Sequence, residues 1–175
     1  MTSHILPLPP HTPELFNVSL IHLADMDANK LDPHHALKLF FMMTDARFTK
    51  LDPAGLCEGE VVLFDFEGFN FRHLMKATTA LYNVRVFLTY VQEAAPWTIR
   101  GIHILNCSTI VSKLFNFLRP FVKKELFEAI QFHTSGYDSL HQIIPKDILP
   151  EEYGGTCSST KIIWKSWLQY LESQR

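Results

Sequence analysis

Two short segments with apolar residues on both sides constrain the fold of this chain more than any other feature of its sequence. EVVLFDF (residues 60–66) and GIHILN (101–106) have the composition of strands, and residues 61–64 are all apolar. A strand that is apolar on both sides is covered on both faces, as in a parallel sheet between helices. Helix-forming segments alternate with these strands, so the sequence predicts an α/β fold with a mostly parallel sheet flanked by helices.

The other elements follow from hydrophobic periodicity and from breaker residues. Pro33 is expected to open a helix, and Pro96 is expected to end one. Pro120 either separates two helices or kinks a single one. We expect one further strand at 16–24 and helices at 32–48, 70–94, 108–117, 118–132 and 160–173.

Proline and glycine mark the segments outside these elements. Residues 51–59 and 147–155 are predicted to be loops, the second with positive φ at Gly154 and Gly155. Asp65 is expected to end its strand and to cap the helix that follows. The proline-rich residues 1–15 are expected to be an extended lead-in, which leaves 16–175 as a single domain.

The segment LRPFVKKELFEAIQF, residues 118–132, is too apolar on one side for a surface helix. Its apolar residues recur at a spacing of three and four, while its basic residues lie mostly elsewhere. This stripe covers either the core of the protein or a molecule that the protein carries. It consists of Leu118, Phe121, Val122, Leu126, Ala129 and Ile130.

Composition excludes several classes of protein. The net charge is −2 and no block of Lys and Arg is present, so a nucleic-acid partner is not expected. The three scattered cysteines and the missing signal pattern indicate a soluble cytoplasmic protein without membrane spans. The 14 phenylalanines suit either a large core or an apolar cavity, and composition does not separate the two.

No sequence motif for catalysis or metal binding is present. GxSxG, HExxH, GxxxxGK[ST] and GxGxxG are all missing. His34 and His35 would point about 100° apart on a helix and so would not share a metal ion. His103 is expected to be a core or sheet-face histidine, and Cys107 has no histidine at a spacing that predicts a nucleophile. We therefore expect no enzyme activity, no catalytic residues, no metal and no cofactor.

Four motifs in order resemble the CRAL-TRIO lipid-binding domain family. They are FDFEGFNFRHL, QEAAPW followed by GIHILN, RPFVKKELFEAIQFH, and LPEEYGG, and they cover roughly residues 16–157. The resemblance is closest to the insect members of the tocopherol- and retinaldehyde-binding branch. It implies a mostly parallel sheet that floors an apolar cavity, closed by a mobile gate helix. The gate would lie at residues 106–129.

The resemblance also implies which residues contact a bound lipophilic ligand, although plain core packing is the alternative for each. The floor would consist of Val62, Phe64, Phe66, Ile102 and Ile104. The walls would consist of Leu39, Phe40, Met43, Phe71, Met75, Phe87, Tyr90 and Val91. The gate would contribute Val111, Leu114, Phe117, Leu118 and Phe121.

Some relatives in this family use a basic cleft beside the gate to contact phosphoinositide head groups. Arg100 matches one such position, whereas Thr98, Glu125 and Ala129 depart from the pattern, so phosphoinositide recognition stays open. The candidate contacts to a head group or a membrane surface are Arg100, Arg119, Lys123 and Lys124.

The leading hypothesis is therefore a carrier that moves a small hydrophobic lipid (a tocopherol, retinoid, carotenoid or phospholipid) between membranes, as a peripheral cytoplasmic protein. The alternative is an adaptor or membrane-targeting module of the same fold that has lost its cargo. An α/β hydrolase is disfavoured because no nucleophile elbow is present. Relatives carry a small helical domain ahead of the lipid-binding domain that is absent here, and we expect this chain to be less stable than a longer form.

Overall fold

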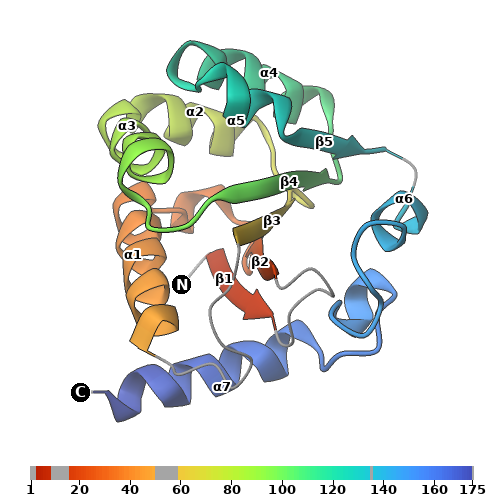
Figure 1. The fold of residues 1–175 in the computed structure, drawn as a ribbon. Helices are drawn as coiled ribbons and strands as arrows, with labels where there is room; N and C mark the ends of the chain where they lie inside the picture. The colour runs from red at the N-terminus through yellow and green to blue at the C-terminus, as the bar shows by residue number, and fades with distance from the viewer. Residues whose placement is uncertain (1–2, 9–15, 50–58, 135, 175) are drawn as a thin grey trace.

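The computed structural model describes residues 3–8, 16–49, 59–134 and 136–174, which form a sheet with helices on both faces (Figure 1). In this part of the chain the sheet has five strands in the order β1-β2-β3-β4-β5. They are β1 (Ser3–Leu8), β2 (Phe16–Leu23), β3 (Gly59–Asp65), β4 (Ile99–Leu105) and β5 (Ile130–His133). Strands β2 to β5 are parallel, which confirms the predicted mostly parallel α/β fold.

Strand β1 corrects the prediction that residues 1–15 form only a lead-in. It pairs antiparallel with β2 at the edge of the sheet, with Leu6 opposite Leu20. Pro7 is compatible with this place because an edge strand needs no donor on its outer side. The sheet therefore begins before the predicted boundary at residue 16. Periodicity could not reveal β1, because the prolines interrupt its pattern.

The helices lie on both faces of the sheet. In Figure 1, α2, α3, α4 and α5 lie above β4, α1 lies beside β1, α6 lies at the right beyond the end of β5, and α7 lies below β1. Their bounds are α1 Pro33–Thr49, α2 Phe71–Thr79, α3 Leu81–Thr89, α4 Thr109–Leu118, α5 Lys124–Glu128, α6 Asp138–His141 and α7 Thr160–Ser173. Short helical turns are η1 Ala28–Lys30, η2 Tyr90–Ala94, η3 Arg119–Phe121 and η4 Glu151–Tyr153. No helix in the described ranges is long and apolar enough to cross a bilayer.

The predicted long helix over residues 70–94 is broken. Ala80, with φ −93° and ψ 36°, separates α2 from α3, and η2 continues α3 as a turn of π-helix. The cap of α2 is Asn70, whose side chain accepts from the backbone N–H groups of Arg72 and His73 at 3.0 and 3.4 Å. The prediction that Asp65 caps this helix is therefore wrong. Its carboxylate instead accepts bonds from other partners, including the hydroxyl of Tyr153 at 2.7 Å.

The apolar segment 118–132 is not a single helix, nor one that only kinks. Pro120 lies in the first turn of η3, α5 follows, and the chain enters β5 at Ile130. Residue Ile102 of β4 is opposite Ile130 and its N–H donates to the carbonyl of Ala129 at 2.9 Å. Pairing with β4 therefore overrides the helical spacing of the apolar residues at the end of this segment.

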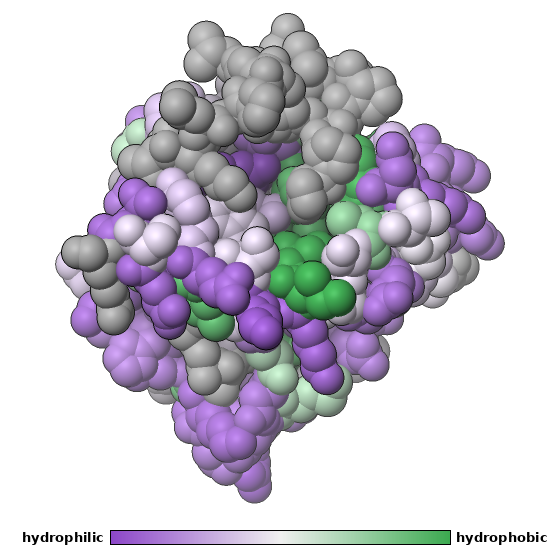
Figure 2. All heavy atoms as spheres, turned by 90° about the horizontal axis from the view of Figure 1, so that it is seen from below, coloured by the Kyte–Doolittle hydropathy of each residue, from purple (hydrophilic) through white to green (hydrophobic). Residues whose placement is uncertain are grey.

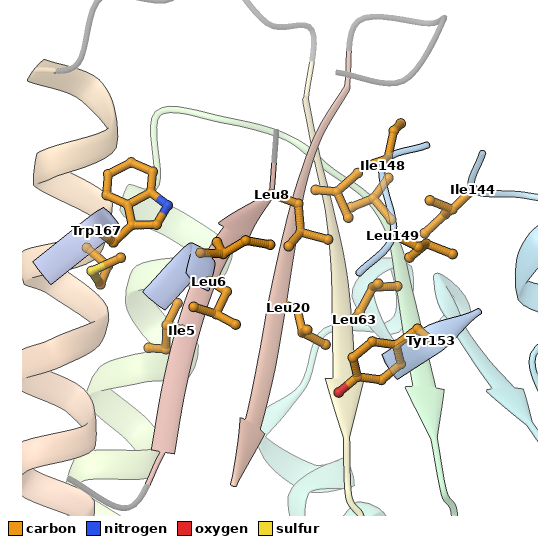
Figure 3. Close-up of a cluster of buried hydrophobic side chains, with 14 of the residues drawn as sticks. Ile5, Leu6, Leu8, Leu20, Leu63, Ile144, Ile148, Leu149, Tyr153 and Trp167 are labelled. Carbon is orange, nitrogen blue, oxygen red and sulfur yellow. The ribbon is translucent and has the colours of Figure 1, made fainter. Parts of the chain in front are cut away.

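One face of the sheet carries the main hydrophobic core. Leucines of β1, β2 and β3 point between the strands and the segments that follow α6, where Ile144, Ile148 and Leu149 are fully buried (Figure 3). On α7, Trp167 lies beside β1 and its indole N–H donates to the carbonyl of Pro7 at 3.0 Å. Seen from below, on the α7 side, the surface carries mostly hydrophilic residues around apolar patches, the clearest of them near the centre (Figure 2). The leucines, the isoleucines and Trp167 thus form a packed core on this face of the sheet.

The turn at residues 147–155 differs in one detail from the prediction. Gly154 has φ 70°, the left-handed conformation that glycine adopts without strain. Gly155 does not have a positive φ. It is required for another reason, because a Cβ there would lie 1.8 Å from the carbonyl oxygen of Leu149. Most of the other predicted loop, at residues 51–58, lies outside the described residues.

Candidate functional site

An apolar cavity of about 650 Å³ lies between the second face of the sheet and helices α1, α3, α4 and α5. This volume is within the range of cavities that hold small organic molecules. The floor follows one row of the strand register, in which Val62 is opposite Ser19 and Ile102, and Ile102 is opposite Ile130. Because side chains alternate along each strand, this row and its neighbours two residues away face the cavity, while the residues between them face the packed core.

More than half of the residues predicted to contact a ligand line this cavity. They come from the floor strands, from α1 and α3, and from α4. They are Phe40, Met43, Val62, Phe64, Phe66, Phe87, Val91, Ile102, Leu114 and Leu118. Their contact with a ligand stays a prediction, but their place around one cavity is a property of the fold.

Five other predicted residues are not among those that line the cavity. Leu39 belongs to the main core, and Ile104 and Val111 pack together in a smaller buried cluster at the end of the floor. Phe71 and Met75 lie on the surface of α2, with 57% and 46% of their area exposed. The break at Ala80 explains these two errors, since the prediction placed α2 and α3 on one continuous helix and gave them a common face.

The remaining three predicted residues lie next to the cavity without lining it. Tyr90 packs behind the wall, with its ring centroid 4.9 Å from that of Phe41 and 5.8 Å from that of Trp97. Phe117 and Phe121 pack against each other at 6.0 Å, and the guanidinium of Arg85 lies 5.2 Å from the centroid of Phe121. These rings hold the walls and the gate in place rather than face the lumen.

Several lining residues were missed by the sequence prediction. The later half of the stripe in 118–132 supplies Val122, Leu126 and Ile130, so the apolar side of that segment does face the cavity. Ile5 and Pro7 could not be found, because their contribution depends on the pairing of β1. The other missed apolar residues are Ile21, Leu88, Pro96, Trp97, Ile99, Phe115 and Phe127.

One end of the cavity is polar. We call this group the polar end; it consists of Asn17, Ser19, Thr44, Arg47 and Glu60. The Nη1 group of Arg47 donates to Glu60 Oε1 at 2.9 Å and to Ser19 Oγ at 2.8 Å. The side chains of Arg47 and Glu60 are only 20% and 11% exposed. Alternation on β2 and β3 could have found Ser19 and Glu60, but only the fold brings Arg47 to them.

The predicted gate, residues 106–129, comprises α4, η3 and α5 and is fastened to η2. The side chain of Gln92 accepts a hydrogen bond from the N–H of Lys123 at 2.5 Å and donates to the carbonyl of Phe121 at 3.2 Å. An exposed ion pair joins Lys123 to Glu93 at 3.2 Å. The side chain of Gln92 therefore holds the link between α4 and α5 through the backbone groups of Phe121 and Lys123. A turn of π-helix at η2 places this side chain, and such turns are frequent at functional sites.

The four basic residues predicted to contact a head group or membrane are all exposed. Arg119 lies over the ring of Phe127 at 5.4 Å, and Lys124 pairs with Glu128 at 3.7 Å. Arg100, on β4, lies over the ring of Phe16 at 5.5 Å. Arg119, Lys123 and Lys124 are thus grouped at the link between α4 and α5, while Arg100 lies on a different element.

Histidines on the packed face form a buried chain away from the cavity. His103 Nδ1 lies 3.0 Å from His133 Nε2, and His133 Nδ1 lies 2.7 Å from Ser139 Oγ. Burial and the neighbouring His133 lower the pKa of His103 to about 4. Burial also lowers the pKa of His133. His103 is a core histidine, as predicted, and within the described ranges no cluster of His, Cys, Asp and Glu is arranged to hold a metal ion.

Comparison with known proteins gives relatives for the fold and the sequence. Clavesin-2 of Rattus norvegicus and of Homo sapiens are each 33% identical over 104 residues, which is 59% of this chain and 31% of those proteins. Clavesin-1 of Xenopus laevis is 31% identical over 98 residues, 56% of this chain and 29% of that protein. The chain thus spans about a third of the length of the curated relatives that it matches.

A solved structure and a family model agree with these relatives. The crystal structure of Sfh5 superposes with a TM-score of 0.64 over 98% of this chain and 64% of that chain, at 13% identity, which is agreement in fold. The model of the CRAL/TRIO domain matches residues 7–155, from within β1 to the glycine pair after η4. The chain therefore belongs to the CRAL/TRIO domain family.

Proposed function

We propose that this protein binds a small lipophilic molecule in the cavity beneath α4 and α5 and transfers it between membranes. The observation that carries the proposal is a cavity of about 650 Å³ whose walls, apart from the polar end, are almost wholly apolar. Membership of a family that binds small lipophilic ligands supports it. A tocopherol, retinoid, carotenoid or phospholipid tail would each find an apolar environment there.

The energetics suit a carrier. Burying a chain of about ten methylenes contributes about 8 kcal/mol, at ~0.8 kcal/mol for each group. Association and ordering cost part of this free energy. An affinity of about 1 μM already needs about 8.2 kcal/mol, so about ten methylenes alone give a weaker affinity and a ligand with a longer apolar body is needed to reach it. The protein retains such a ligand in aqueous solution and releases it where a membrane competes for it.

The volume of the cavity favours a carrier over an adaptor that has lost its cargo. An adaptor of this fold is expected to fill the space with its own large side chains. Phe64, Phe66 and Phe115 line the cavity and do not fill it. The rings pack against one another along the wall, with 6.1 Å between the centroids of Phe66 and Phe115.

Loading and release require a door, and the gate is the candidate. Its inner side contributes Leu114, Leu118 and Leu126 to the cavity, so its movement would open the lumen directly. Arg119 and Lys124 are exposed on the same segment and would meet an anionic membrane surface. We propose a peripheral, cytoplasmic protein whose gate faces the bilayer. A more specific form of this proposal is that Arg100 contacts the head group of a phosphoinositide.

We further propose a binding role rather than catalysis. The cavity wall is apolar in its main part, and an apolar lumen that only encloses a ligand needs few polar side chains. The polar end consists of an ion pair with amide and hydroxyl neighbours, which is an arrangement suited to hydrogen bonding. A fluorescent ester turnover assay checks this point, and measurable turnover would contradict it.

Organic extraction of the purified protein, followed by mass analysis, tests the carrier proposal. A lipophile is expected to co-purify with the unmodified chain. Val62→Phe is the matched variant, because it adds a ring to the middle of the floor and is expected to lower the recovered lipophile about tenfold or more. Its thermal midpoint serves as a check on folding. Recovery of no lipophile, together with no uptake from labelled vesicles, would overturn the proposal.

A further inference from the structure

We infer that the polar end selects a neutral lipid with a hydroxyl group at one end, in preference to a fatty acid or another lipid carboxylate. The inference rests on the proposed carrier function and adds the chemical class of the ligand. One observation carries it: an ion pair between Arg47 and Glu60 lies in the wall of a cavity that is otherwise mostly apolar.

The polar groups are confined to one end of the cavity. Asn17 and Glu60 lie opposite each other near the amino ends of β2 and β3, and Arg47 lies near the end of α1. Towards the other end of β3 the floor consists of Phe64 and then Phe66. The six residue steps from Glu60 to Phe66 cover ~20 Å of extended chain. The cavity therefore fits a ligand with one polar end and a long apolar body.

The hydrogen-bonding capacity of the ion pair matches a hydroxyl group. Arg47 is a donor only, and its bonds to Glu60 and Ser19 both use Nη1, one of the three nitrogens that carry the five N–H donors of a guanidinium. Glu60, when ionised, is an acceptor only. A hydroxyl both accepts and donates, so it can bind the guanidinium and the carboxylate together. A carboxylate can only accept.

Charge also disfavours a lipid carboxylate. With side chains 20% and 11% exposed, Arg47 and Glu60 lie where water screens charge poorly. The positive charge of Arg47 is balanced by Glu60 at 2.9 Å. A ligand carboxylate would bring a second negative charge beside Glu60, whereas a hydroxyl brings none. The ion pair thus excludes acids while it attracts alcohols.

Retinol and retinoic acid are suitable probes, because they share a ring and a polyene and differ in the hydroxyl or carboxylate end. Trp97 lies in the cavity wall, so quenching of tryptophan fluorescence reports their binding. The unmodified protein is expected to bind retinol about tenfold or more tightly than retinoic acid. Hexadecanol and hexadecanoate, measured by competition, give the same comparison for a straight chain.

Two substitutions are expected to move this preference in opposite directions. Glu60→Gln leaves the charge of Arg47 unbalanced, so the affinity for the acid should rise about tenfold relative to the affinity for the alcohol. Arg47→Met leaves the carboxylate of Glu60 without this cation, so the affinity for the acid should fall further relative to the affinity for the alcohol. Asp45→Asn, at an exposed position on α1, removes a negative charge outside the cavity and is expected to leave the preference unchanged. Partial unfolding of a variant lowers the amount of binding for retinol and for retinoic acid alike. It therefore does not change the ratio of their affinities when both are measured on one preparation.

The outcomes separate this inference from the carrier function. Preference for the alcohols, with opposite shifts in the two variants, supports it. Equal binding of alcohol and acid, preference for the acid, or a ratio that Glu60→Gln does not change overturns the inference and leaves the carrier function standing. If none of the four probes binds the folded protein, the inference is overturned; the carrier function is contradicted as well only if no lipophile co-purifies with the protein and none is taken up from labelled vesicles.

Discussion

The two faces of the sheet are built from alternate residues of the same strands and have opposite properties. On the packed face, Leu6, Leu20 and Leu63 are completely buried against the segments around α6 and α7. On the cavity face, Val62 and Ile102 border a volume of about 650 Å³. One face is thus filled by buried side chains, and the other borders a cavity.

This difference indicates a division of roles within one domain. The packed face contributes most of the burial that stabilises the fold, and under the proposed function the cavity face leaves contacts for a ligand to make. Ligand binding is then expected to stabilise the protein by mass action, since the ligand contacts only the folded state. Substitutions on the packed face should mainly change the free energy of unfolding, and substitutions on the cavity face should mainly change ligand affinity.

The largest expected effect comes from neighbouring residues of β3 that face opposite ways. Leu63→Ala should lower the free energy of unfolding by about 3 kcal/mol, because it leaves a void in a fully buried core. Val62→Ala, one residue away, should cost about 1 kcal/mol or less in the absence of ligand, because its side chain already borders open space. Urea denaturation of both variants measures the two values. Equal losses would show that the two faces are packed alike.

Acid should weaken the packed face. The pKa of His103 is lowered from 6.5 to about 4 by burial and by His133, so between these pH values the unfolded state binds more protons than the folded state. Stability is then complete above about pH 6.5 and falls as the pH drops towards 4. The contribution of this one group is at most about 3 kcal/mol.

Urea denaturation between about pH 7 and about pH 4.5 measures this dependence. His103→Gln should make the fall in stability shallower, whereas His34→Gln, at an exposed position on α1, should leave it unchanged. Stability of the unmodified protein that does not fall over this interval would contradict the proposed effect of burial.

The smallest effect should appear in the kinetics of the cavity face. Gln92→Ala removes two hydrogen bonds to the link between α4 and α5, worth about 1 kcal/mol or somewhat more in total, so ligand release should accelerate about five- to tenfold. Glu93→Ala is the matched control, because its ion pair with Lys123 is exposed and contributes little. Stopped-flow transfer of retinol to vesicles measures both rates. Equal release rates in Gln92→Ala and Glu93→Ala would show that the hydrogen bonds of Gln92 do not hold the gate closed.

Local sequence patterns were enough to predict the class of fold and much of the cavity floor. Strand alternation is a local property, so the pattern of residues 60–66 alone places Val62, Phe64 and Phe66 on one side of β3. The helix at α1 was predictable for the same reason, with a proline at its start. The four ordered motifs indicated the family, which the match over residues 7–155 confirms.

Packing between distant segments settled the features that these patterns could not. Ile130 has helical spacing in the sequence but pairs with Ile102 in the sheet. Phe71 was wrongly predicted to line the cavity, because the break at Ala80 leaves no clear signal in the sequence. The pairing of Arg47 with Glu60 joins the end of α1 to the start of β3. Contacts of this kind depend on how elements pack, and no periodicity within a single segment can encode them.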